Sequence, residues 1–380
     1  MASRRRALLI TPLYPPQVGG VQRFLEQMCE DWPDDLRVLA VSYDREQEQR
    51  YDASRDWSIE RVAYRRRLTP LRIARVAGRA SRGCDYVVWG TLRLAALVGL
   101  LAPRLLRLPW AISVYGKELT ESSPCPIGWF ERWALRRARR VVAISRYAAQ
   151  QAAMSGARPE AMRIVTPAID SSWCERSVDE DRVLVLRKRY GLGSGPILLS
   201  VGRLVLRKGI DQVLRALPQI AADHPDLVYV IAGSGPAREA LERLAQEMAI
   251  ADLVRFVGRV REEDLGSWYD LADLFLMPSR VTQAGDSEGF GIVFLEAQAR
   301  GVPVIAGDEG GMADAVCPEA GRLVDGHDVQ AIAHAVSDIL GRPDGGLAMG
   351  RAGRCFVQAE MTTAVQRTKW ARLAREIVDG

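Results

Sequence analysis

Two glutamates, Glu288 and Glu296, stand eight residues apart around two glycines and an apolar run. The apolar run predicts a helix to about Arg300, which Gly301 would end. An α-helix rises about 1.5 Å per residue, so this spacing predicts carboxylates roughly 12 Å apart on one side of the helix. The backbone N–H groups of the opening turn would lie between them and could bind an anion. This order suits a sugar nucleotide, which carries hydroxyls at both ends and a diphosphate between them.

The spacing also has a plainer explanation. Glu288 could simply complement the positive end of the helix dipole while Glu296 lies in solvent. On spacing alone the two interpretations are equally supported.

Two cations, Arg203 and Lys208, lie in a predicted strand-to-helix loop. Because such loops open into a crevice at the carboxyl ends of parallel strands, we expect both side chains to point there. Cleaving a sugar from a diphosphate develops negative charge on the leaving phosphate, which cations and N–H dipoles stabilise. Arginine offers a fork to phosphate oxygens and lysine a point charge. Two solvated loop cations remain the simpler explanation when the pair is considered by itself.

A glycine pair, Gly19 and Gly20, follows a predicted strand and precedes a helical pattern. A strand, a glycine loop and a helix in this order let the backbone approach a phosphate. A glycine pair by itself is more often only a turn.

The elements that would position these residues alternate between strand and helix. The alternation predicts an α/β chain with two doubly wound parallel sheets, each covered by helices on both faces. We expect an N-terminal domain over residues 1–172, a charged linker over 171–190 and a C-terminal domain over 190–361. The predicted strands are Ala7–Thr11, Arg37–Ser42, Asp85–Thr91, Trp110–Gly116, Arg140–Ser145, Met162–Ile169, Pro196–Arg203, Leu227–Ala232, Val254–Val257, Leu274–Met277, Val302–Ala306 and Gly321–Val324.

Composition limits the class of protein. The 380 residues, 48% of them hydrophobic, suffice for two full cores. Six scattered cysteines without CxxC pairs and only three histidines indicate a reducing compartment and no structural zinc. The apolar runs are too short to span a bilayer, and no signal peptide is evident, so we expect a cytoplasmic protein. Residues 1–190 carry a net charge of +12 and residues 191–380 a net charge of −7, which suggests an anionic partner for the first half.

Two motifs carry a resemblance to a known family. The run Ser287–Glu296 resembles the E-x7-E signature of family-four retaining glycosyltransferases, which have the GT-B fold, and Val201–Gly209 resembles their G-R-L-x-x-x-K-G motif. The resemblance implies that Glu288 contacts the donor sugar and Glu296 the nucleotide ribose. It also implies that Arg203 and Lys208 bind the donor diphosphate in place of the metal that other glycosyltransferases use.

The resemblance extends over nearly the whole chain. It implies an acceptor-side N-terminal domain, a nucleotide-sugar-binding C-terminal domain, and a terminal helix over about 362–380 that packs back on the first. The first glycine loop would close on the donor phosphate and acceptor, and the strand end at Arg259 and Val260 would receive the nucleobase. The donor-binding positions that it implies are Gly19, Gly20, Gly202, Gly235, Arg259, Val260, Gly289, Phe290, Gly291, Ile292 and Glu296.

One position departs from the family pattern. Tyr115 stands where the family often has a histidine near the donor sugar. A phenol can hydrogen-bond a sugar hydroxyl, but it is not a cation near neutral pH. We therefore keep Tyr115 as a donor-binding residue without the role of the histidine.

Two other motifs are set aside. Asp179-Glu180-Asp181 spells the D-x-D metal signature of a different glycosyltransferase fold, but it lies in the charged linker segment. Gly191-Leu192-Gly193-Ser194-Gly195 precedes its strand and has the wrong glycine spacing for dinucleotide binding.

The sequence therefore predicts a metal-independent retaining glycosyltransferase that moves a hexosyl-type unit from a nucleotide diphosphate sugar to a hydroxyl acceptor, with no cofactor and no nucleic-acid partner. Two alternatives stay open: a UDP-sugar epimerase of the same fold, and a catalytically silent sugar-nucleotide-binding protein. The segment Trp129–Arg140 combines aromatic residues with arginines, which suits an anionic membrane surface. Its aromatic residues could equally pack on the sheet, with arginines at the helix end.

Overall fold

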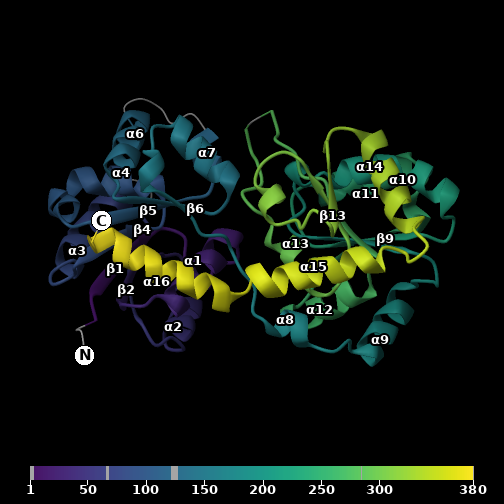
Figure 1. Cartoon of the computed structure of the whole chain (residues 1–380), viewed down its shortest axis with the longest axis horizontal. Helices are drawn as coiled ribbons and strands as arrows, with labels where there is room; N and C mark the ends of the chain where they lie inside the picture. The colour runs from purple at the N-terminus through teal and green to yellow at the C-terminus, as the bar shows by residue number, and fades with distance from the viewer. Residues whose placement is uncertain (1–3, 66–67, 121–126, 284, 380) are drawn as a thin grey trace. The chain divides into compact units, whose positions relative to one another are not determined.

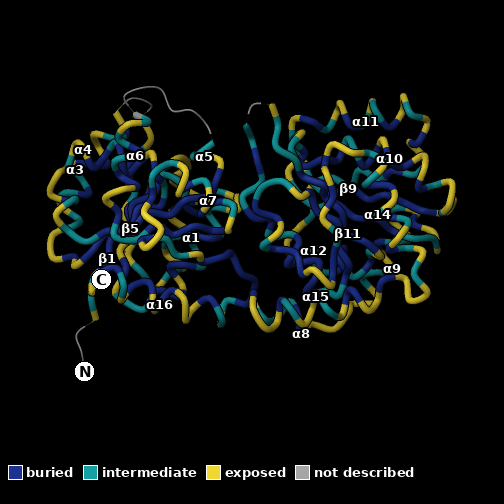
Figure 2. Tube along the Cα trace, turned by 45° about the horizontal axis from the view of Figure 1, so that its top comes forward, coloured by how far each residue is buried: buried dark blue, intermediate teal, exposed yellow. Residues whose placement is uncertain are grey.

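The computed structural model describes residues 4–65, 68–120, 127–283 and 285–379. It divides into two compact units, Met1–Ala168 with Thr363–Gly380, and Ile169–Thr362 (Figure 1). Each unit is an α/β sandwich around one parallel sheet, as the strand–helix alternation predicts. Figure 2 shows the strands as largely buried and the exposed residues on the outer surfaces of the helices and loops.

The first unit holds a seven-stranded parallel sheet in the order β3-β2-β1-β4-β5-β6-β7. Its central strands are almost wholly apolar because helices cover both faces. The strands are β1 (Arg6–Thr11), β2 (Asp35–Ser42), β3 (Ser58–Ala63), β4 (Tyr86–Trp89), β5 (Trp110–Val114), β6 (Arg140–Ala143) and β7 (Met162–Ile164). The helices of eight residues or more are α1 (Gly20–Asp31), α2 (Arg45–Asp52), α3 (Thr69–Ala80), α4 (Leu92–Leu101), α6 (Ile127–Arg137), α7 (Arg146–Met154) and α16 (Thr363–Asp379).

The second unit holds a six-stranded parallel sheet in the order β10-β9-β8-β11-β12-β13. The strands are β8 (Ile197–Val201), β9 (Val228–Ala232), β10 (Val254–Gly258), β11 (Leu274–Met277), β12 (Val304–Gly307) and β13 (Gly321–Val324). The helices of eight residues or more are α9 (Glu180–Tyr190), α10 (Ile210–Asp223), α11 (Arg238–Glu247), α12 (Glu262–Leu271), α13 (Ile292–Ala299), α14 (Val329–Leu340) and α15 (Leu347–Glu360). Every strand predicted in this half is present.

One strand of the first sheet, β3, is missing from the sequence prediction. It lies at the sheet edge and pairs with β2, and among its six residues only Val62 is buried. An edge strand needs little apolar surface, so its sequence lacks the continuous apolar run that marks the central strands.

The segment expected as a linker is structured and belongs to the second unit. It forms the short helix α8 (Ser172–Glu175) and helix α9. The carboxylate of Asp179 caps α9 by accepting a 2.9 Å hydrogen bond from the backbone N–H of Arg182. The sequence Asp179-Glu180-Asp181 is therefore the N-cap and first turn of helix α9.

The last helix, α16, returns to the first unit. Trp370 is buried there, with its ring 5.4 Å from that of Phe24 and 5.8 Å from that of Trp32, so α16 packs on α1 (Figure 1). Of the helices in the described residues, none is both long enough and apolar enough to cross a membrane. The five cysteines among those residues are free thiols.

Each sheet contains one position where the strand order reverses its direction along the chain. In the first sheet that position lies between β1 and β4, and in the second between β8 and β11. Loops that follow two such strands leave the sheet on opposite faces, so a crevice opens at their carboxyl ends. The loops after β1, β8 and β11 carry Gly19 and Gly20, Arg203 and Lys208, and Glu288, respectively.

Candidate active site

Lys208 and Glu288 meet at the reversal point of the second sheet. Lys208 ends the loop after β8, and Glu288 lies in the loop after β11. The ammonium nitrogen of Lys208 lies 2.8 Å from Oε2 of Glu288, and both side chains are largely buried. Strand order alone brings these two residues together, because β8 and β11 are neighbours in the sheet although 80 residues separate the side chains in sequence.

Arg207 adds a second cation to the same carboxylate. Its Nε lies 3.5 Å from Oε2 of Glu288, and its Nη1 donates a 3.1 Å hydrogen bond to Asp286. The carbonyl oxygen of Arg207 accepts a 2.8 Å hydrogen bond from the backbone N–H of Arg280. Sequence analysis assigned no role to Arg207, although its place beside Lys208 in the motif was a signal.

A further ion pair joins the loop after β11 to helix α10. Arg280 binds the carboxylate of Asp211 with both guanidinium Nη groups, at 3.0 and 2.7 Å. Two parallel charge-assisted hydrogen bonds fix both distance and orientation. The two loops of the site are therefore held by several ion pairs rather than by one.

The charge state of Glu288 follows from these contacts. Burial by itself would raise the pKa of Glu288, but Lys208, and then Arg207, outweigh burial, so the pKa lies below its ordinary value. Glu288 is thus an ionised hydrogen-bond acceptor at neutral pH. It is not poised to donate a proton.

Arg203 differs from the other cations of the site. It is exposed, and within the described part of the chain it forms no ion pair. Its neighbour Leu204 is buried and bonds through its backbone to Ser234 and Ala237. The backbone at Arg203 is thus anchored while the guanidinium stays available to an anionic ligand.

Glycines occupy the carboxyl ends of β8, β9 and β10. A Cβ on Gly233 would lie 1.8 Å from the carbonyl oxygen of Gly202, and one on Gly235 would lie 2.3 Å from that of Leu204. The N–H of Gly233 donates a 2.7 Å hydrogen bond to the carbonyl of Gly258. Only glycine permits backbones to approach so closely, so these loops form one connected backbone surface.

Two predicted nucleobase-binding residues, Arg259 and Val260, follow β10 directly. Arg259 is exposed and Val260 half-buried. Their backbone groups lie beyond Gly258, next to the glycine surface at the carboxyl end of the sheet.

Glu288 does not lie in the helix that carries Glu296, which corrects the spacing estimate. Helix α13 begins at Ile292, and Gly291 before it has φ of +88°, a left-handed conformation that a right-handed helix cannot contain. Glu288 and Gly289 therefore belong to the preceding loop, and the helical separation of roughly 12 Å does not apply. As expected, the helix ends before Gly301, which has φ of +77°.

Glu296 is buried inside the second unit. Its Oε2 accepts a 2.8 Å hydrogen bond from the hydroxyl of Tyr269 on α12, and only 2% of the residue is exposed. The ring of Tyr269 packs edge-on against Trp173 of α8, 6.1 Å away. The interpretation of Glu296 as a solvated helix residue is therefore wrong, and its contact with a ribose stays a prediction.

Gly289, Phe290 and Gly291 precede α13, and Ile292 is its first residue. Phe290 is 3% exposed, so its side chain belongs to the core and only its backbone can serve a ligand. The N–H of Phe294 already donates to the carbonyl of Gly291, at 3.0 Å.

In the first unit, Gly19 and Gly20 start α1. Gly19 is extended, and Gly20 is exposed with no atom within 4 Å of where its Cβ would stand. Internal packing thus gives no reason for glycine at position 20, which fits a position kept small for a ligand.

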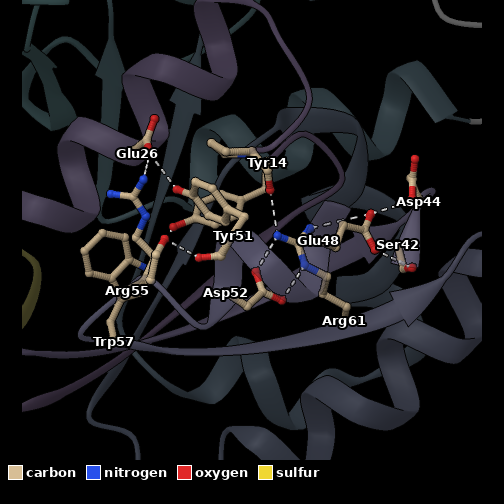
Figure 3. Close-up of polar contacts among 12 residues, drawn as sticks. Tyr14, Glu26, Ser42, Asp44, Glu48, Tyr51, Asp52, Arg55, Trp57 and Arg61 are labelled. Atoms are coloured by element: carbon tan, nitrogen blue, oxygen red, sulfur yellow. Dashed lines mark hydrogen bonds and ion pairs between the residues drawn. The ribbon is translucent and has the colours of Figure 1, made fainter. Parts of the chain in front are cut away.

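A buried polar cluster anchors the loop that carries these glycines (Figure 3). Arg61 of β3 pairs with Asp52 at 2.7 Å and lies 3.8 Å from Glu48, and it donates a 2.6 Å hydrogen bond to the carbonyl of Pro15. Beside it, the indole N–H of Trp57 donates to the hydroxyl of Tyr14 at 2.9 Å. The sequence pattern did not indicate this cluster, because its members come from α2, β3 and two loops that only the fold brings together.

Tyr115 follows β5 and is buried. Its hydroxyl donates a 2.9 Å hydrogen bond to the carbonyl of Gly90, and its ring lies edge-on to Phe24. Burial raises the pKa of Tyr115 well above its ordinary value, so the phenol stays neutral. With its proton committed to Gly90, this hydroxyl could serve a sugar only as a hydrogen-bond acceptor.

Comparison with known proteins gives consistent matches. Residues 185–355 match the family model described as glycosyl transferases group 1, and residues 19–168 match that of the glycosyl transferase 4-like domain. The chain is 36% identical over 98% of its length, and 98% of the relative's, to a GDP-mannose-dependent alpha-(1-6)-phosphatidylinositol monomannoside mannosyltransferase of Mycolicibacterium smegmatis. It is 31% identical to a GDP-mannose-dependent monoacylated alpha-(1-6)-phosphatidylinositol monomannoside mannosyltransferase of Corynebacterium glutamicum, over 95% of each chain. The structure superposes on HepE of Anabaena, solved in complex with UDP, with a TM-score of 0.82 at 17% identity, covering 97% of this chain and 99% of HepE.

Proposed function

Because the chain belongs to family four of the glycosyltransferases, which have the GT-B fold, we propose that it transfers a mannosyl unit from GDP-mannose to a hydroxyl of a phosphatidylinositol mannoside glycolipid, with retention of configuration. The observation that carries the donor and acceptor is the identity of 36% over 98% of both chains to an enzyme with that donor and acceptor in its name.

The ion-pair geometry supports the assignment of roles around the donor. Arg203 is exposed and unpaired in the described part of the chain, and Lys208 is held beside Glu288. In the proposed complex these two cations neutralise the diphosphate as the sugar–phosphate bond breaks. Their charge takes the place of a divalent metal.

Glu288 accepts hydrogen bonds from the donor sugar. Its lowered pKa keeps it an acceptor, which suits sugar hydroxyls, and its pairing with Lys208 links the sugar site to the phosphate site. The ion pair between Glu288 and Lys208 thus couples the binding of the sugar to the position of the lysine that contacts the phosphate.

Retention proceeds by attack on the face of the sugar from which the phosphate departs. The acceptor oxygen forms the new bond to the anomeric carbon, the bond from that carbon to the diphosphate oxygen breaks, and the leaving phosphate takes the acceptor's proton. No side chain of the site is assigned as a covalent nucleophile, and the ionised Glu288 is engaged by two cations.

We further propose that the protein works at the inner face of a membrane, since the proposed acceptor is a lipid. The basic first half and the exposed Trp129 of α6 support this. Anionic lipids attract clustered arginines by about 1 kcal/mol per residue near the surface.

The test is a donor panel. The protein is incubated with GDP-mannose or UDP-glucose, with and without a phosphatidylinositol mannoside, and the lipid extract is analysed for added hexose by mass spectrometry. We expect added hexose from GDP-mannose only. A converted sugar nucleotide without transfer would support the epimerase alternative, and no turnover of either donor would support the silent binding protein.

A further inference from the structure

A pocket lies in the first unit at the amino ends of β5 and β6. It has a volume of about 250 Å³ and is lined by three arginines (Arg107, Arg137, Arg139), two tryptophans (Trp110, Trp133), two leucines and a proline. The N–H of Arg139 donates to the carbonyl of Trp110 at 3.0 Å, which fixes the two strand starts side by side. The Gly19–Gly20 loop follows the carboxyl end of β1, whereas the pocket lies at the amino end of β5. Because β5 has five residues, the two ends of the sheet are roughly 15 Å apart along the strands.

The lining carries only positive charge. No carboxylate is among the residues that line it. Arg107 and Arg137 are exposed and form no ion pair among the described residues. This contrasts with neighbouring arginines of the unit, since Arg93 pairs with Glu131, and Arg140 with Glu376.

Arg139 supplies a second, independent sign of a ligand. Its Nε is buried yet has no hydrogen-bond partner in the described part of the chain. The Nε atoms of Arg55, Arg182 and Arg342 are in the same state, but those three guanidinium groups pair with carboxylates through their other nitrogens, whereas Arg139 forms no ion pair among the described residues. A buried N–H of a charged group is rarely left unpaired, because the loss of its water contacts is uncompensated. An oxygen of an anion in the pocket would satisfy it.

Helix-end electrostatics explain only part of this arrangement. Arg137 lies in the last turn of α6, where a cation complements the negative end of the helix dipole. That dipole of α6 accounts neither for Arg107, which ends the short 3₁₀ helix Pro103–Arg107 before β5, nor for the buried Nε of Arg139. It also does not explain why the half-buried Trp133 stands among the arginines, whereas the buried Trp110 belongs to the core.

Trp133 extends the pocket along α6. Trp129, Trp133 and Arg137 are spaced four residues apart, so they share one side of the helix. Trp129 is 57% exposed. Tryptophans with a wet edge and an apolar body are typical of the boundary between lipid headgroups and acyl chains.

We propose that this pocket binds the phosphate of an anionic phospholipid in a bilayer, with the arginines on the phosphate and with Trp129 and Trp133 of α6 at the start of the acyl chains. The inference rests on the membrane association proposed above, but not on the donor, the acceptor or the reaction. The proposed lipid site lies at the amino ends of the strands, whereas the glycine loop lies at their carboxyl ends.

The test compares two double variants of equal charge. Arg107→Gln with Arg137→Gln removes two pocket arginines. Arg104→Gln with Arg136→Gln removes two exposed arginines from the same segments, neither of which lines the pocket. Cosedimentation with vesicles of phosphatidylglycerol and phosphatidylcholine (3:7), and with phosphatidylcholine alone, gives a Kd for each protein.

We expect the pocket variant to bind the anionic vesicles at least tenfold more weakly than the control variant, while both retain the unfolding midpoint of the parent. Equal weakening in the two variants would overturn the pocket and leave only non-specific charge. No binding of the parent to anionic vesicles would overturn the membrane association as well. Thermal stabilisation by inorganic phosphate that depends on Arg107 and Arg137, without vesicle binding, would replace the lipid by a soluble phosphate. None of these outcomes depends on catalysis, so the proposed reaction is tested separately by the donor panel.

Discussion

The hydroxyl of Tyr269 donates a 2.8 Å hydrogen bond to Oε2 of Glu296, across two helices of the second unit. Both residues are buried, and Tyr269 in turn packs against Trp173. The hydroxyl of Tyr269 therefore orients the Glu296 carboxylate, which is predicted to bind the donor ribose.

Tyr269→Phe should destabilise the protein and loosen the placement of Glu296. A hydrogen bond to a charged group contributes about 1.5–3 kcal/mol, and the loss should appear in urea unfolding. If the phenol also positions the carboxylate, GDP affinity measured by calorimetry should fall while the affinity for inorganic diphosphate should not. Unchanged affinity for both ligands would assign Tyr269 to stability alone, and equal losses would mean that the substitution disturbs the whole donor site.

Glu296→Gln should weaken nucleotide binding. The amide is nearly isosteric with the carboxylate but uncharged, and losing a charged hydrogen-bond partner costs about 1.5–3 kcal/mol, or roughly tenfold to a hundredfold in Kd. Isothermal titration with GDP measures the change. An unchanged Kd in a folded variant would remove the ribose contact from the model of the site.

Lys208→Met should destabilise the protein in a pH-dependent way. Removing one partner of a buried pair costs up to about 3–5 kcal/mol at pH 7, because Glu288 is left charged without its nearest cation. In the parent the pKa of Glu288 is lowered, so the stability that the pair contributes is present above the ordinary value of 4.5 and is lost as pH falls through the folded-state value.

The difference in unfolding free energy between the parent and Lys208→Met should therefore shrink from pH 7 to pH 4. Arg238→Met, which breaks the more exposed pair with Glu242, is the matched control and should change little at either pH. A difference that stays constant with pH would contradict the assignment of an ionised Glu288.

Arg61→Met should loosen the loop that carries Gly19 and Gly20. The Arg61 side chain is 9% exposed and joins Asp52 to the carbonyl of Pro15, so its removal leaves a half-buried carboxylate and a carbonyl without their donor. Hydrogen exchange in the segment 14–20 should accelerate, and the unfolding free energy should fall by about 2–4 kcal/mol. Arg50→Met on neighbouring α2 breaks only an exposed pair with Glu46 and should leave both measurements nearly unchanged.

Turnover should persist in EDTA. Arg203 and Lys208 supply the positive charge at the diphosphate in the proposed mechanism, so no divalent ion is needed. The measurement is the rate of hexose transfer before and after dialysis against EDTA. Activity that disappears and returns with magnesium or manganese would refute the metal-independent mechanism.

Much of this protein follows from local pattern. The apolar run after Gly291 and the glycine at 301 are sufficient to predict α13 and its end, because helix formation and termination depend on neighbouring residues. The central strands are similarly visible as short apolar runs. The edge strand β3 is not, because one row of neighbours buries too little of it.

The partners of the site residues were decided by tertiary structure. Lys208 and Arg207 meet Glu288 because β8 and β11 are adjacent at the point where strand order reverses, and no local pattern encodes that order. Glu296 meets Tyr269, and Tyr115 meets Gly90, for the same reason. The sequence by itself thus determined which residue types were available and which elements carry them. Only the packing of those elements decided which carboxylate is paired, which phenol is committed inward and which arginine stays open, since these depend on contacts between residues far apart in the chain.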